Sequence, residues 1–128
     1  MSIQRFEMSK EQIIMLHDLM ISAFNGVNDT LEPGSLDKVM DLYNQPSTGR
    51  QILAKASALL FGIIRYHPFL DANKRTAILV VTTFLNMNNF DFECTEAQCY
   101  DIVEKIEKGY LSREELKEQI FGIVIPRV

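Results

Sequence analysis

The most constraining feature of this sequence is an apolar segment that has no polar face. Residues 73–88 read NKRTAILVVTTFLNMN, and their apolar side chains fall on nearly every side of a helical wheel. A helix that is apolar all round is usually buried at the centre of its domain. A strand over ILVVTTF alone is the alternative, but the pattern runs through the whole segment without an internal Gly or Pro. We therefore predict a buried central helix.

Five further helices are predicted from apolar spacing and from residues that begin and end helices. They are expected at about residues 10–24, 35–44, 50–66 and 95–109, with a last short one that opens at Ser112. Three of the starts carry Ser or Thr with Gln or Glu three positions later, which is the capping-box pattern: Ser9 with Gln12, Thr95 with Gln98, and Ser112 with Glu115. The sequence thus predicts an all-α fold of about six helices.

Two short segments do not fit the helical pattern. Residues 90–93, FDFE, are expected to form a brief extended link, and the C-terminal GIVIPRV is open between an edge strand, a docked tail and a partner contact. No repeat, low-complexity segment or linker divides the chain, so residues 1–128 are expected to form one compact domain.

Composition and charge narrow the class of protein. A net charge of −4 without any long run of Lys or Arg gives no reason to expect direct nucleic-acid binding. No apolar run is long enough to cross a membrane, and the N-terminus lacks the apolar region of a secretory signal. Cys94 and Cys99 match no common metal spacing, and we expect them to be reduced thiols. These features indicate a cytoplasmic protein.

The segment HPFLDANKRTA, residues 67–77, places charged groups just before and within the start of the apolar helix. The first N–H groups of a helix have no intrahelical partner, and the helix dipole favours negative charge there. Asp71 to Lys74 would therefore form an anion-binding turn, to which Lys74 and Arg75 add cationic donors. His67 is suited to act as a general base, and Asp71 offers the oxygen ligand that Mg²⁺ needs.

The residue types alone leave an ordinary alternative open. A histidine next to a proline is often a surface or capping residue, and an aspartate before a helix is often its N-cap. Two cations in a first helical turn often form only a solvated face. On these grounds a phosphate-binding loop and a structural loop both remain possible interpretations.

The segment HPFLDANKR resembles the signature of the Fic/Doc family, whose usual form is HPFx(D/E)GNGRxxR. It is closer still to the form HxFxDANKR of the Doc (death-on-curing) branch. EQIIMLHDLMISAF and YLSREELKEQI resemble the family's opening and closing helices, so the resemblance covers nearly the whole chain. It implies a small all-α domain.

The resemblance also implies roles for individual residues. His67 would be the catalytic base, and Asp71 would coordinate Mg²⁺ or orient the substrate hydroxyl. Nucleotide or phosphate contacts would fall on Ala72, Asn73, Lys74 and Arg75, and the structural positions of the signature on Pro68 and Phe69.

Two departures from the usual signature bear on the reaction. Ala72-Asn73-Lys74 replaces Gly-Asn-Gly, and Ile78 stands where AMP-transferring members have a second arginine. The Doc branch shares this form, and in that branch the γ-phosphate of ATP meets the acceptor hydroxyl. The resemblance then implies a kinase-type toxin that modifies a Ser or Thr of elongation factor Tu. An AMP transferase and a non-catalytic binding module of the same fold are the alternatives.

Regulation by a partner is the last implication of the resemblance. The self-inhibitory sequence of some Fic proteins, (S/T)xxxE(G/N), is not found, because the acid that follows Ser112 falls one position early, at Glu115. Control would instead come from a small Phd-like antitoxin.

Overall fold

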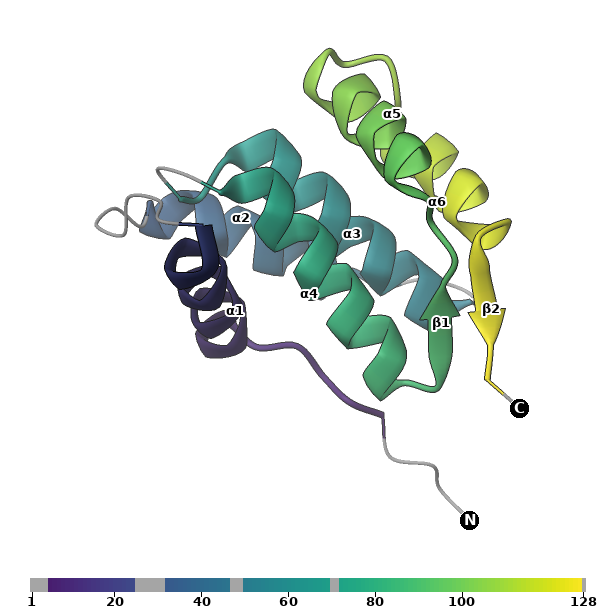
Figure 1. Ribbon diagram of the computed structural model, residues 1–128, viewed down its shortest axis with the longest axis horizontal. Helices are drawn as coiled ribbons and strands as arrows, with labels where there is room; N and C mark the ends of the chain where they lie inside the picture. The colour runs from purple at the N-terminus through teal and green to yellow at the C-terminus, as the bar shows by residue number, and fades with distance from the viewer. Residues whose placement is uncertain (1–4, 25–31, 47–49, 70–71, 128) are drawn as a thin grey trace.

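The computed structural model describes residues 5–24, 32–46, 50–69 and 72–127, and these form six helices and two short strands (Figure 1). In chain order the elements are α1 (Lys10–Phe24), α2 (Pro33–Tyr43), α3 (Gln51–Tyr66), α4 (Asn73–Met87), β1 (Phe90–Phe92), α5 (Glu96–Glu107), α6 (Arg113–Phe121) and β2 (Val124–Pro126). The predicted all-α fold of about six helices is confirmed. In the described residues, no helix is long and apolar enough to cross a membrane.

Helix α3 lies at the centre of the fold. It contacts α2, α4, α5 and α6, and Figure 1 shows it beside α4, with α1 on one flank of the pair and α5 and α6 on the other. Ten residues of α3 are buried, compared with seven of α4. The predicted buried helix at residues 73–88 is thus present as α4, but α3 is the more buried of the two and is the central one. One side of α4 stays near the surface, where Ile78 and Leu79 are half-buried and Met87 is exposed.

Helices α1, α5 and α6 begin directly after the capping residues that the sequence predicted. Both predicted capping boxes in the C-terminal half are present, at the starts of α5 and α6. Ser9 and Gln12 exchange the same pair of hydrogen bonds before α1, at 2.8 and 3.2 Å. Helix α2 begins at Pro33, two residues earlier than predicted, because proline at the first helical position has no N–H to leave unsatisfied.

The two segments outside the helical pattern pair with each other. β1 and β2 run antiparallel, with Phe90 opposite Pro126 and Phe92 opposite Val124. The expected extended link at residues 90–93 is thus a strand, and of the three possibilities for the C-terminal tail the structure shows an edge strand. The pairing holds the end of the chain against β1, which itself packs on α4.

Close packing of α2 on α3 depends on Gly62. A Cβ added to Gly62 would lie 3.2 Å from both γ-methyl groups of Val39 and 3.3 Å from its Cα. Val39 is fully buried, so it has no room to move away. We expect Gly62→Ala to lower the free energy of unfolding by about 1–2 kcal/mol, despite the better helix propensity of alanine. Urea unfolding followed by circular dichroism measures this.

Gly34→Ala is the matched control for that substitution. Among the described residues, a Cβ at Gly34 meets no atom within 4 Å, so we expect a change within about 0.5 kcal/mol. A Gly62→Ala variant as stable as the wild type would contradict the packing described here.

Candidate functional site

His67 lies at the point where α3 ends. It is the C-cap residue, with a left-handed backbone (φ 46°, ψ 62°), and its N–H donates a hydrogen bond to the Ile63 carbonyl at 3.2 Å. Left-handed conformations are uncommon for residues other than glycine. Pro68 follows and has no N–H with which to continue the helix. The chain therefore turns sharply at His67, whose side chain is exposed.

Phe69 fastens the loop to the rest of the fold. Its ring is 5% exposed and stacks on the ring of His17 from α1, with centroids 3.8 Å apart and planes within 6°. His17 is itself buried, with 4% of its surface exposed. The carbonyl of Pro68 accepts a hydrogen bond from the backbone N–H of Glu32 at 2.6 Å. The loop is thus held both by α1 and by the residue that precedes α2.

Asn73 closes the loop from the other end. Its Oδ1 accepts a hydrogen bond from the Phe69 N–H at 3.1 Å, and its Nδ2 donates to the Phe69 carbonyl at 2.8 Å. Asn73 is 8% exposed, so both bonds are sheltered from water. The side-chain amide therefore holds the backbone of the loop. Because the side chain is engaged in this way, a phosphate at this position would be contacted by the backbone N–H of Asn73.

The start of α4 has no cap from its N-cap side chain. The N-cap residue is Ala72, which has a left-handed backbone (φ 64°) and makes no side-chain cap hydrogen bond. The starts of α5 and α6, by contrast, are closed by capping boxes. The first N–H groups of α4 have no partner within the helix, and this is the end of a helix that favours an anion. Leu70 and Asp71 lie outside the described residues, so the roles predicted for Asp71 stay predictions.

The two cations at the start of α4 point to different neighbours. The Lys74 ammonium lies 3.1 Å from a carboxylate oxygen of Glu107, at the end of α5. The Arg75 guanidinium lies over the ring of Phe24, 4.3 Å from its centroid, at the end of α1. No local pattern pointed to Glu107 as a partner of Lys74, because that contact depends on how α5 packs. The contact between Arg75 and Phe24 was not predicted either, because it forms only when the end of α1 lies near the start of α4.

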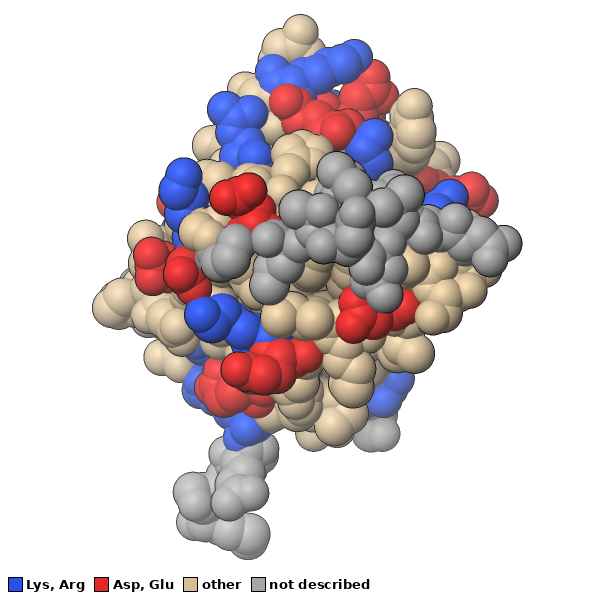
Figure 2. Space-filling view, turned by 90° about the vertical axis from the view of Figure 1, so that its left-hand side faces the viewer, with Lys and Arg blue, Asp and Glu red and all other residues tan. Residues whose placement is uncertain are grey.

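The surface around this end of the molecule carries both signs of charge. Figure 2 shows Lys and Arg interspersed with Asp and Glu on this face, without a broad basic area among the coloured residues. Nor do the described residues contain a group of three or more His, Cys, Asp or Glu arranged to hold a metal ion. An anion bound at this end would therefore depend on local donors rather than on the overall field of the protein.

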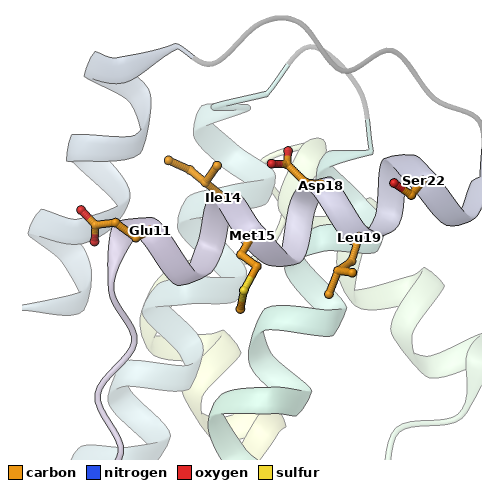
Figure 3. Close-up of a pocket in the computed structure, with 6 residues that line it drawn as sticks. All are labelled: Glu11, Ile14, Met15, Asp18, Leu19 and Ser22. Atoms are coloured by element: carbon orange, nitrogen blue, oxygen red, sulfur yellow. The ribbon is translucent and has the colours of Figure 1, made fainter.

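A separate depression of about 350 Å³ lies along the outer side of α1. Its lining residues all come from this one helix (Figure 3): Glu11, Ile14, Met15, Asp18, Leu19 and Ser22. It is an open strip on the surface of a helix, and it contains none of residues 67–77. The other side of α1 carries His17, which supports the loop through Phe69.

Comparison with known proteins identifies the fold. A sequence model of the Fic/DOC family matches residues 7–85, which include α1, α2, α3, most of α4 and the loop at residues 67–77. The chain belongs to the Fic/DOC family. It is also 35% identical over 83 residues to a protein of Escherichia phage P1 named protein kinase doc. The aligned part spans 62% of this chain and 66% of that relative, just under two thirds of its length.

Replacing Asn73 tests how the loop is held. In Asn73→Ala the buried N–H and carbonyl of Phe69 both lose their partner, so we expect a loss of about 2–4 kcal/mol in the free energy of unfolding. Asn73→Asp keeps the acceptor for the N–H but cannot donate to the carbonyl, so its loss should be smaller. Urea unfolding, together with hydrogen exchange at the Phe69 amide, compares the two variants. An Asn73→Ala variant as stable as the wild type would show that the amide does not hold the loop.

Proposed function

We propose that this protein transfers the γ-phosphate of ATP to a Ser or Thr hydroxyl of a translation factor, with elongation factor Tu as the expected target. The observation that carries the proposal is the arrangement of the loop: an exposed His67 lies where α3 ends, and the loop after it leads to the N-terminal end of α4, which favours an anion. Membership of the family and the name of the phage P1 relative support a transferase of this kind. ATP and translation factors place the reaction in the cytoplasm.

In the proposed reaction, a few groups of the protein each have a separate role. The imidazole of His67 takes the proton from the acceptor hydroxyl, whose oxygen then attacks the γ-phosphorus while ADP leaves. The backbone N–H groups of Asn73, Lys74 and Arg75 face the phosphate oxygens at the start of α4. The guanidinium of Arg75, steadied by Phe24, adds positive charge.

We propose that Mg²⁺ binds together with ATP. It usually binds through one or two carboxylates, substrate phosphates and water, so it needs no cluster of protein ligands. Asp71 is the carboxylate in the right part of the sequence, two residues before α4. When bound, the ion would neutralise charge on the phosphates.

The choice of phosphate over AMP rests on three residues of this chain. Ala72 carries a side chain where the AMP-transferring form of the signature has glycine. Lys74 does so too, and its ammonium pairs with Glu107. Ile78 packs half-buried against the core, so it supplies no second cation to hold a triphosphate in the AMP-transfer pose. These features favour the γ-phosphate as the transferred group, with AMP transfer as the runner-up.

Labelled ATP separates the candidate reactions. We expect label at the γ-position to pass to purified elongation factor Tu, and His67→Ala to lower the rate about 10²–10⁴-fold. Tyr100→Ala, which changes a highly exposed residue of α5, is the control and should leave the rate unchanged. Transfer of α-label would instead establish AMP transfer. No transfer by the wild type, with growth arrest kept in His67→Ala, would establish a non-catalytic module.

For the Phd-like antitoxin we propose the outer strip of α1 as the docking surface. Met15 and Leu19 are more than half exposed there, and the carboxylates of Glu11 and Asp18 border them (Figure 3). A helix with an apolar face and flanking Lys or Arg would match this pattern of contacts and charge.

A charge placed in that strip tests the docking surface. We expect Leu19→Glu to abolish co-purification with the protein of a neighbouring antitoxin-like reading frame, because it buries a carboxylate in the apolar contact. Circular dichroism checks that the variant folds, and Tyr100→Ala again serves as the control. An unchanged complex with Leu19→Glu would place the antitoxin elsewhere.

A further inference from the structure

The two cysteines meet at the start of α5. Cys94 immediately precedes the N-cap residue Thr95, and Cys99 is the fourth residue of the helix. These are the positions of a hydrophobic staple, at which side chains on either side of a helix start pack together. The capping box between Thr95 and Gln98 fixes the turn between them, with bonds of 2.8 and 3.1 Å. Both thiols are free and half-buried, and their sulfur atoms lie 2.7 Å apart.

This separation is shorter than an ordinary non-bonded contact. Even carbon atoms, which are smaller than sulfur, prefer about 3.5–4.0 Å, whereas a disulfide bond is about 2.05 Å long. Bond formation would therefore need a movement of well under an ångström, and the capping box could stay in place. We propose that Cys94 and Cys99 are a modification site, at which a peroxide or a low-molecular-weight disulfide produces a reversible intrachain disulfide.

With hydrogen peroxide the reaction has two steps. The Cys99 thiolate attacks one peroxide oxygen and becomes a sulfenic acid, while the O–O bond breaks and the departing hydroxide takes up a proton to become water. The sulfur of Cys94 then attacks the sulfenic sulfur, the S–O bond breaks, and a second water leaves with the Cys94 proton. The two thiols lose two electrons and two protons, and the peroxide becomes two waters.

The environment of Cys94 indicates the order of these steps. Burial, and after it the hydrogen bond and the charge interaction with Cys99, raise the pKa of Cys94 to about 12. Cys94 is therefore a thiol near neutral pH, and Cys99 reacts first.

The disulfide would stabilise the N-terminal end of α5. It would join Cys94, which precedes the N-cap residue, to Cys99 in the first turn of the helix. This end of α5 could then no longer fray. The other end of α5 carries Glu107, the partner of Lys74. The site lies outside residues 7–85, and its oxidation does not depend on the proposed phosphate transfer.

Mass spectrometry of the full-length protein tests the site. The reduced protein is treated with hydrogen peroxide, or separately with glutathione disulfide, and remaining thiols are then labelled with a maleimide. We expect the monomer to lose two hydrogen atoms and both labelling sites, and dithiothreitol to restore them. The oxidised form should unfold at a temperature roughly 5 °C higher than the reduced form.

The single variants Cys94→Ser and Cys99→Ser are the matched controls. Each retains one thiol, so glutathione disulfide should give a stable glutathione adduct instead of an internal bond. If the wild type keeps both labelling sites, or forms only intermolecular dimers or sulfinic acids, the proposal is wrong. This outcome is read on the wild type alone, so it stands even if a serine variant fails to fold.

Discussion

The pair of hydrogen bonds between the Asn73 side chain and the backbone of Phe69 is the interaction on which the rest of the site depends. A single buried amide satisfies both the N–H and the carbonyl of Phe69, at 3.1 and 2.8 Å. Left-handed residues stand at both ends of the loop, His67 where α3 ends and Ala72 where α4 begins. Such conformations persist only when the surroundings impose them. The bonds from Asn73 supply that constraint, and they fix where His67 and the start of α4 lie.

Helix α1 adds the second constraint through two residues, His17 and Phe24, which lie about two helical turns apart. His17 forms a stacked layer beneath Phe69, and Phe24 lies against the guanidinium of Arg75. One helix therefore supports both the loop and one of its cations. The outer side of the same helix exposes the apolar strip with Met15 and Leu19. A partner that covered this strip would touch the element that supports the loop.

Local signals in the sequence predicted much of this fold, and tertiary contacts explain what they missed. The capping boxes at Thr95 and Ser112 were visible because their partners lie three residues away. Apolar spacing located the helices but not their relative burial, since an all-apolar pattern does not show which side of α4 a neighbour covers. The signature at residues 67–77 located the loop. It did not show that the Asn73 side chain binds backbone or that Lys74 pairs with Glu107, because these contacts form only once the chain has folded.

In the proposed reaction, the start of α4 binds the phosphates of a nucleotide. The most direct measurement is a titration of the isotope-labelled protein with Mg²⁺ and a non-hydrolysable ATP analogue, followed by amide chemical shifts. We expect the largest shifts at the amides of Asn73, Lys74 and Arg75, together with a change at the His67 side chain. Saturable binding that leaves these amides unmoved, and shifts residues elsewhere instead, would contradict it.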